Sequence, residues 1–259
     1  MKFPVRSTLA AAALLAGLLA GLLPASPALA QDIEAGVLKG TVVDARGAPL
    51  KGAEIVADNT LLYNSNALGV SKADGSYRIP TNAVAGTYRP SAQLKRKFNG
   101  KTYTFALETD DDAPFDGAEG AVRNFTWKLT GEYGDNRRHG STLLFYFGSY
   151  EDPQNNEAMI RQEDVEFTLK PVGPLIDGSE GQTITRRGEA TGDGFGVPDL
   201  AIARYQVEAR YAAEGTPARP LLVRVRGKDD YAPSVTADFV PMTSLVQFIE
   251  IEVKLPGAT

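Results

Sequence analysis

Apolar and polar residues alternate along most of this chain, with the period of two that half-buried strands show. The alternation is clearest in five segments, 125–129, 165–169, 205–210, 223–226 and 249–255. Because successive side chains of a strand point to opposite faces of a sheet, each segment buries one face and exposes the other. The pattern predicts antiparallel sheets packed face to face, with almost no helix after residue 30.

Turn residues punctuate the predicted strands. In the stretch VVDARGAPLKGAEI, Asp44 can bond its own backbone, Gly47 supplies a positive φ, and Pro49 suits the entry to a strand or its edge. We therefore expect a strand over 37–43, a turn at Asp44–Gly47, and a second strand that begins at residue 53.

Two more turns have strong signatures. Asp74-Gly75 predicts a tight turn before a strand in which Tyr77 and Ile79 face inward. Asn99-Gly100, between two apolar segments, predicts a two-residue hairpin.

The first thirty residues have the pattern of a signal peptide. Lys2 and Arg6 precede an apolar run over 9–23, and Ala28-Leu29-Ala30 has the small residues that signal peptidase accepts. A retained membrane anchor is the alternative, but the run is shorter than the roughly 20 residues that a bilayer needs. The sequence predicts cleavage after Ala30 and a secreted or periplasmic product with no transmembrane span.

Composition narrows the function classes. Removal of the leader leaves 229 residues, enough for one large or two modest domains, with 25 basic and 32 acidic residues and a net charge of −7. A surface of that sign argues against binding to nucleic acid, whose phosphates need basic partners. The chain has no cysteine, so an exported product must depend on core packing and not on disulfides.

Three linked motifs occur in the first half: Gly40-x-Val42-x-Asp44-x-x-Gly47-x-Pro49-Leu50-x-Gly52-Ala53-x-Ile55, Asp74-Gly75-x-Tyr77-x-Ile79 and Gly86-x-Tyr88. Together they resemble the carboxypeptidase regulatory-like domain over roughly 36–129. The resemblance implies a transthyretin-like β-sandwich, close to the prealbumin and starch-binding-like sandwiches. Such domains are usually non-catalytic modules of secreted peptidases, outer-membrane receptors and adhesins. This chain differs from the family at 59–68, where the connection is longer and carries Tyr63.

The second half repeats, in the same order, fragments that resemble the end of the first half. ARYQVEARY, LLVRVR, DDYAP and IEIEVKL follow the order of GTYRPSAQL, TYTFAL, DDAP and FTWKL. A diverged second copy and a chance similarity between hairpins both explain this. We predict an all-β chain with two immunoglobulin-like or transthyretin-like antiparallel β-sandwich domains, residues 31–131 and 132–259, after the signal peptide.

Catalytic residues are scarce. His139 is the only histidine, it follows two arginines in a polar, glycine-rich segment, and we expect it to be a solvated loop residue. With one His and no Cys, zinc hydrolysis and Cys–His catalysis lack the necessary groups. No G-x-S-x-G elbow, phosphate loop or dinucleotide fingerprint occurs. The sequence therefore predicts no enzyme, no catalytic residue and no cofactor.

Two acidic stretches are candidates for calcium. Residues 108–120 hold a cluster of carboxylates, and Asp193 and Asp199 lie among glycines. Neither stretch has the glycine and final bidentate Glu of a calcium loop. We interpret both as solvated loops and predict no metal site, with calcium binding as the alternative.

One aromatic segment is a candidate ligand surface. In LLFYFGSYED, we expect Leu143, Phe145 and Phe147 to face the core, Tyr146 to face outward, and Tyr150 to lie on the following loop. Exposed tyrosine rings can stack on sugars, although a single outward Tyr also packs commonly along a sheet. Trp127 occupies an inward position and is predicted to be core.

Three functions are compatible with these observations. The first is a non-catalytic secreted module that binds or scaffolds an unknown protein or polysaccharide of the cell envelope. The second is a carbohydrate-binding protein that uses Tyr146 and Tyr150, which the relation to starch-binding-like sandwiches suggests. The third is an enzyme of unrecognised type.

Overall fold

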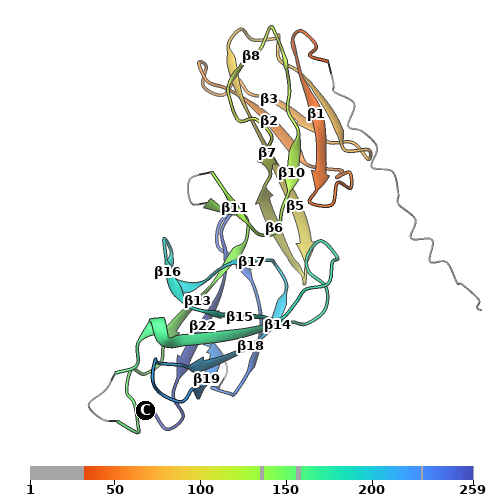
Figure 1. The fold of residues 1–259 in the computed structure, drawn as a ribbon. Coiled ribbons are helices and arrows are strands. Elements are labelled where there is room, and N and C mark those ends of the chain that lie inside the picture. The colour runs from red at the N-terminus through yellow and green to blue at the C-terminus, as the bar shows by residue number, and fades with distance from the viewer. Residues whose placement is uncertain (1–31, 135–136, 156–158, 229, 259) are drawn as a thin grey trace, which may run out of the picture. The chain divides into compact units, whose positions relative to one another are not determined.

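The structure is a computed structural model that describes residues 32–134, 137–155, 159–228 and 230–258 (Figure 1). It confirms the predicted all-β class, because the regular structure in these ranges is strand apart from one short 3-10 helix, η1 (Gln162–Asp164). None of the helical structure in these ranges has the length and apolarity required to span a bilayer. The predicted signal peptide and its cleavage site after Ala30 lie outside the described residues.

The strands that precede residue 130 form two five-stranded sheets. One has the order β4-β1-β10-β7, with β9 paired to β1, and the other has the order β3-β2-β5-β6, with β8 paired to β5. Their bounds are β1 (Val37–Asp44), β2 (Glu54–Asn59), β3 (Ala67–Val70), β4 (Ser76–Pro80), β5 (Thr87–Phe98), β6 (Lys101–Ala106), β7 (Glu108–Thr109), β8 (Phe115–Asp116), β9 (Ala121–Val122) and β10 (Phe125–Trp127).

The core between these two sheets follows the predicted alternation. Tyr77 and Ile79 are buried, whereas Arg78 between them is exposed. Trp127 is buried as predicted, and its ring packs against Phe105 from the facing sheet with 5.3 Å between ring centroids. Each sheet thus contributes one apolar face to a common interior.

The predicted turns are confirmed in atomic detail. The Asp44 carboxylate accepts hydrogen bonds from the backbone N–H groups of Arg46 and Ala48, each at 2.9 Å, and Gly47 has φ +83°. Asn99 and Gly100 both have positive φ, +47° and +77°, as a type I′ hairpin turn requires.

Strand direction differs from the antiparallel prediction in three places. β1 pairs in parallel with β9 and with β10, and β13 (Ser141–Phe147) pairs in parallel with β22 (Gln247–Lys254). Alternation of apolar residues specifies which face of a strand is buried, but not the direction of its neighbour. The sheets are therefore mixed, although most pairs are antiparallel.

The later strands form one continuous sheet with the order β15-β14-β18-β19-β22-β13-β17-β16, to which β20 and β21 add at the sides. A small hairpin of β11 (Glu132–Tyr133) and β12 (Arg137–Arg138) precedes it. The remaining bounds are β14 (Val165–Pro171), β15 (Ile184–Arg187), β16 (Glu189–Thr191), β17 (Gly194–Leu200), β18 (Arg204–Tyr211), β19 (Arg219–Val225), β20 (Val235–Asp238) and β21 (Val240–Pro241).

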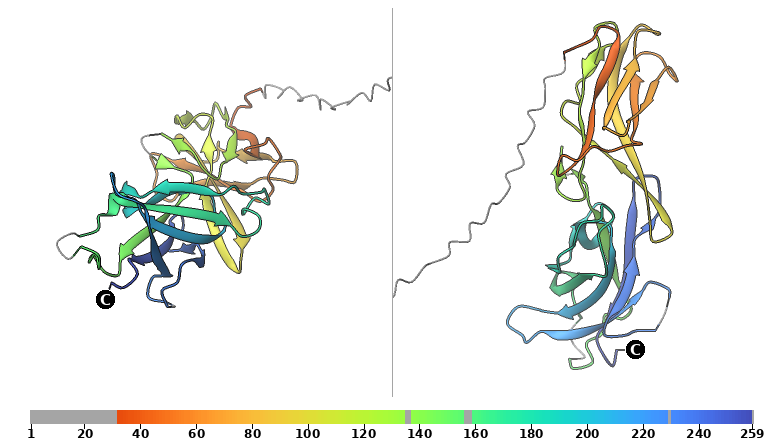
Figure 2. Two further views of the ribbon diagram at one scale, coloured as in Figure 1. Left: turned by 60° about the horizontal axis from the view of Figure 1, so that its bottom comes forward. Right: turned by 90° about the vertical axis from the view of Figure 1, so that its right-hand side faces the viewer.

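This long sheet folds over on itself around an aromatic centre. Phe145 of β13 and Phe167 of β14 have ring centroids 4.9 Å apart, although three strands separate β13 from β14 in the sheet order. Strands β13 and β14 must therefore face each other, so a single path of strands gives the layered packing of a sandwich. Figure 2 shows two further views of this part of the chain.

β13 is more deeply buried than its sequence pattern predicts. Leu143 and Phe145 are buried as expected, but Leu144, on the opposite face, is buried as well, and Phe147 is half-buried. β13 pairs with β22 on one side and β17 on the other, so it is a central strand that is covered on both faces.

No strand of the earlier group pairs with a strand of the later group in the described residues. Side chains make the contacts between the groups. The Tyr103 hydroxyl donates a buried hydrogen bond of 2.8 Å to the Phe239 carbonyl, and burial raises the pKa of Tyr103 to about 12. The Asn99 side chain donates to Asp238 at 2.8 Å.

Gly40 provides a test of the packing of β1. A Cβ at Gly40 would lie 1.7 Å from the Arg123 carbonyl oxygen, a backbone atom that cannot move aside cheaply. We expect Gly40→Ala to lower the free energy of unfolding by about 1–3 kcal/mol or more. Urea denaturation followed by tryptophan fluorescence measures this. Gly192→Ala is the control, because nothing lies within 4 Å of its added Cβ; equal midpoints for the two variants would contradict the packing.

Candidate functional site

The two tyrosines predicted as a ligand surface are not equivalent. Arg226 lies over the Tyr146 ring, 3.7 Å from its centroid, and the Tyr146 hydroxyl donates to Glu250 at 3.1 Å. Burial and the hydrogen bond to Glu250 raise the pKa of Tyr146. One face of this ring is therefore already covered by a cation.

Tyr150 is more accessible. Its side chain is about half exposed, and its ring packs edge-on against Phe147 with a centroid distance of 4.9 Å. Phe147 and Tyr146 are neighbours on β13 and so point to opposite faces of the sheet. The structure therefore does not bring Tyr146 and Tyr150 together as one stacking platform, and binding of a sugar by either ring stays a prediction.

The prediction that His139 is solvated is wrong. Only 2% of its side chain is exposed, its ring stacks on Tyr133 at 4.3 Å, and its Nε2 lies 3.0 Å from a carboxylate oxygen of Glu108. The hairpin of β11 and β12 folds Tyr133 over the imidazole, while Glu108 reaches it from β7. The polar, glycine-rich sequence around His139 could not reveal this, because Glu108 lies 31 residues earlier.

Glu108 is held by two cationic or hydrogen-bonding partners. Lys128 Nζ lies 2.6 Å from the same Glu108 oxygen that faces His139. The hydrogen bond from Lys128, opposed by burial and helped by His139, lowers the pKa of Glu108. This carboxylate is consequently ionised at neutral pH and contacts both Lys128 and His139.

The acidic loop at 108–120 does not converge on a cation. Asp110 accepts two hydrogen bonds from Asn124, Asp111 pairs with Arg123 at 3.0 Å, and Asp116 accepts from the backbone of Ala118. Across the described residues, no group of three or more His, Cys, Asp or Glu side chains is arranged to hold a metal ion.

Asp199, the other calcium candidate, closes a loop. Its carboxylate accepts backbone hydrogen bonds from Gly131 and from Gly140, at 2.9 and 3.0 Å, and so ties together the two ends of the β11–β12 hairpin. Asp199 has φ +57°, a conformation that is strained for a residue with a side chain. The two amide hydrogen bonds to the carboxylate offset the cost of this conformation.

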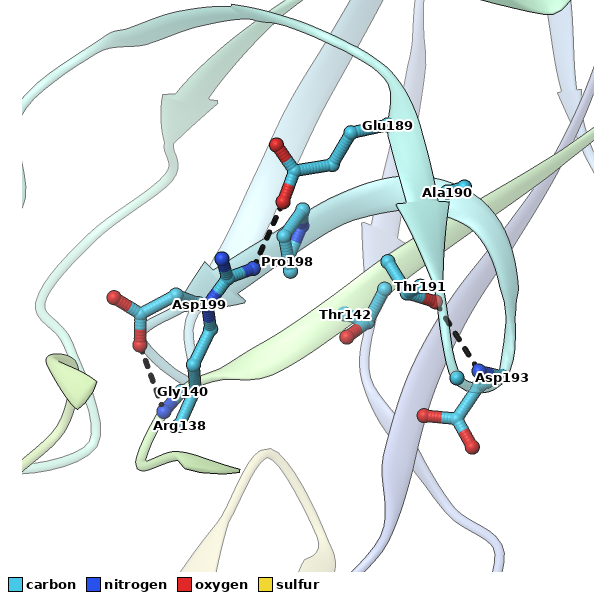
Figure 3. Close-up of a pocket in the computed structure, with 10 residues that line it drawn as sticks. Arg138, Gly140, Thr142, Glu189, Ala190, Thr191, Asp193, Pro198 and Asp199 are labelled. Carbon is cyan, nitrogen blue, oxygen red and sulfur yellow. Dashed lines mark hydrogen bonds and ion pairs between the residues drawn. The ribbon is translucent and has the colours of Figure 1, made fainter. Parts of the chain in front are cut away.

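A polar cavity of about 360 Å³ lies beside Asp199 (Figure 3). β12, β13, β16 and β17 line it with the residues Arg138, Gly140, Thr142, Glu189, Ala190, Thr191, Gly192, Asp193, Pro198 and Asp199. Arg138 and Glu189 form an ion pair of 2.9 Å across its wall, and Thr191 accepts a hydrogen bond from the Asp193 amide at 3.2 Å.

The cavity is lined by hydrogen-bonding groups. Its lining contains no Ser, Cys or His, and no aromatic ring. Its carboxylates, threonine hydroxyls and guanidinium can bind a small polar ligand. Sequence patterns missed Arg138, Thr142 and Glu189, because these residues meet only through the pairing of strands far apart in the chain.

Comparison with known proteins gives remote structural similarity only. No protein-family model and no curated protein sequence matches the chain. Similar solved structures include the Bacillus anthracis TIE protein, with TM-score 0.34 and 13% identity over 85% of this chain and 33% of that chain. The C-terminal fragment of the pilus adhesin SpaC from Lactobacillus rhamnosus GG has TM-score 0.27 and 14% identity, over 83% of this chain and 95% of the fragment.

A DUF3823 family protein from Bacteroides uniformis has TM-score 0.23 and 11% identity, over 82% of this chain and 100% of its own. Of the TIE protein named above, this chain spans only about a third of the length. TM-scores this low carry no inference about ligand or activity.

The Glu108 network predicts a pH-dependent stability. We expect Glu108→Gln to lower the free energy of unfolding at pH 7 by about 0.2–1 kcal/mol, the usual value of a partly exposed ion pair. Because folding lowers the pKa of Glu108 from 4.5, its contribution is complete above pH 4.5 and disappears as the pH falls through the lower folded value. Thermal unfolding from pH 3 to pH 8 measures the difference.

The matched control is Glu119→Gln, because Glu119 is exposed and forms no ion pair with any of the residues that the structure describes. Its stability should parallel that of the unmodified chain at every pH. A Glu108→Gln deficit that does not decrease at all as the pH falls below 4.5 would contradict the role of this carboxylate.

Proposed function

We propose that this chain is a secreted, non-catalytic β-sandwich protein that binds or scaffolds another component of the cell envelope. The proposal includes the leader peptide, with cleavage after Ala30, and two sandwich domains, residues 31–131 and 132–259. The first would be a carboxypeptidase regulatory-like module, as its turn motifs suggest. The second would be a diverged β-sandwich, in which β13 pairs in parallel with the last strand, β22, as β1 pairs with β10 in the first domain.

The state of the buried carboxylates carries this proposal. Three acidic residues are buried among the described residues: Asp44, Asp152 and Asp164. Asp152 forms an ion pair of 2.6 Å with Arg219, whose hydrogen bond lowers the pKa of Asp152. A carboxylate that stays ionised and bonded to an arginine is a poor general acid at neutral pH.

The other two buried acids have structural partners as well. Asp44 accepts backbone hydrogen bonds within its own turn, and these lower its pKa despite burial. Asp164 lies 3.1 Å from Arg161 and 3.5 Å from Arg187. Because each of the three buried acids is bonded to such partners, their carboxylates are better suited to a structural role than to catalysis.

Binding to the envelope is the outcome that we expect. The purified exported chain should co-sediment saturably with isolated cell envelopes of its own source and should show no turnover in a general hydrolase screen. The mature N-terminus, determined by intact mass, should be Gln31. Turnover that is abolished by a cavity variant such as Glu189→Gln would overturn the non-catalytic proposal, as would absence of any envelope binding.

A carbohydrate-binding function is the second candidate, favoured by the exposure of Tyr150 and by the polar cavity. In this case a glycan array should give a signal that Tyr150→Ala or Tyr146→Ala weakens, because loss of one stacking ring costs about 0.5–1.5 kcal/mol. Tyr150→Phe keeps the ring and is the matched control. An array with no signal, or equal loss in Tyr150→Phe and Tyr150→Ala, would argue against ring stacking.

A further inference from the structure

The hairpin of β2 and β3 carries an exposed apolar surface that no function described above uses. Five large apolar side chains lie within ten residues of each other: Leu61 (71% exposed), Leu62 (49%), Tyr63 (101%), Leu68 (71%) and Val70 (59%). We call these five residues the hairpin patch. Clusters of this kind on a soluble protein usually mark an interaction surface.

The loop at the tip of the hairpin is held in place by specific hydrogen bonds. The Asn59 side-chain oxygen accepts hydrogen bonds from the backbone amides of Leu61 and Leu62, at 3.0 and 2.9 Å. The backbone amide of Asn59 donates to the side-chain oxygen of Asn66 at 3.1 Å. The Thr60 amide donates to the Thr87 carbonyl of β5 at 2.9 Å. The exposed side chains are thus presented by an ordered loop.

β3 is an edge strand whose outer backbone is open. Among the strands that the structure describes, it pairs with β2 alone (Figure 1). The Ser71 amide donates to the Ala53 carbonyl at 2.9 Å, and hydrogen-bonded pairs alternate along an antiparallel ladder. Gly69 therefore bonds to β2, whereas the N–H and C=O groups of Leu68 and Val70 point away from the sheet.

This edge lacks the usual protection against pairing. Natural edge strands carry charges, prolines or bulges that prevent the addition of another strand. The stretch Asn59–Ser71 contains no charged residue and no proline, and β3 pairs with β2 in an unbroken register.

We propose that the occupant of this edge is the β3 strand of a second copy of this chain, paired antiparallel about a two-fold axis. Leu68 of each copy would lie opposite Val70 of the other and exchange both backbone hydrogen bonds with it. Gly69 would meet its own copy at the centre, where no side chain interferes. Leu68 and Val70 of both copies then form one continuous apolar strip on the outer face.

The absence of charge in the hairpin patch is what pairing with a second copy requires. A two-fold interface places the same surface on both sides, so a charged patch would repel itself. The predicted mature chain carries a net charge of −7, but the hairpin patch lies in thirteen consecutive uncharged residues. Two copies can therefore approach here without the repulsion that they meet elsewhere. This inference does not depend on the proposed envelope function.

A four-residue edge and five side chains form a small interface. Stable interfaces bury about 800 Å² on each partner, and smaller ones are weak and transient. We therefore expect a reversible dimer in the micromolar range, which sedimentation velocity from about 1 μM to 1 mM should detect as a rising weight-average mass. The processed chain, without its predicted leader, is the sample for this experiment.

Leu68→Lys should weaken the dimer at least about tenfold, since it places a charge against Val70 of the other copy and adds two like charges to the apolar strip. Val70→Thr keeps the branched shape of the side chain and should weaken the dimer less. Leu68→Pro removes an outward N–H that β2 does not use, so it should abolish pairing while thermal unfolding of the monomer stays close to that of the unmodified chain. Circular dichroism confirms that each variant is folded.

Met242→Lys is the matched control, because Met242 is as exposed as Val70 and lies outside the hairpin patch. It should leave the dissociation constant unchanged. A chain that stays monomeric up to 1 mM would overturn the proposal. Equal weakening by Met242→Lys and Leu68→Lys, or a dimer that is unaffected by the Leu68 and Val70 variants, would overturn it as well.

Discussion

Burial of alternate apolar side chains between facing sheets is the constraint on which the whole structure depends. The chain has no disulfide and no metal-ligand cluster among its described residues, so this burial must supply the stability that orders the backbone. Each buried Leu, Ile or Phe contributes about 1.5–3 kcal/mol relative to an exposed one. Strand β13 shows the strongest form of the constraint, because both of its faces are covered.

The same constraint leaves polar chemistry to turns, strand ends and edges. Asp44 closes its own turn, Asp199 ties a hairpin to a strand, and the ionised Asp152 pairs with Arg219. These carboxylates stabilise loops that the apolar interior cannot hold. The surface carries, among other features, a polar cavity beside Asp199, the half-exposed ring of Tyr150, and the hairpin patch on the edge of the first sandwich.

Two local features depart from this pattern: the positive φ of Asp199 and the exposed apolar side chains of β3. Asp199 keeps an unfavourable φ because its carboxylate bonds two amides from another part of the chain. Leu68 and Val70 stay exposed on an edge strand, where alternation would normally place polar residues. The first is explained by a contact within the chain, whereas the second has no such explanation within the described residues and therefore directs attention to a partner.

The sequence by itself determined the all-β class, the inward positions of Tyr77, Ile79 and Trp127, and the turns at Asp44–Gly47, Asp74-Gly75 and Asn99-Gly100. Side-chain alternation and positive φ are local properties. Only the tertiary structure decided which strands are parallel, that the later strands form a single folded sheet, and that His139 is buried against Glu108. It also decided that Arg138, Glu189 and Asp199 share a cavity and that Arg226 covers Tyr146. These depend on contacts between residues far apart in the chain, and no local period records which distant strand will become a neighbour.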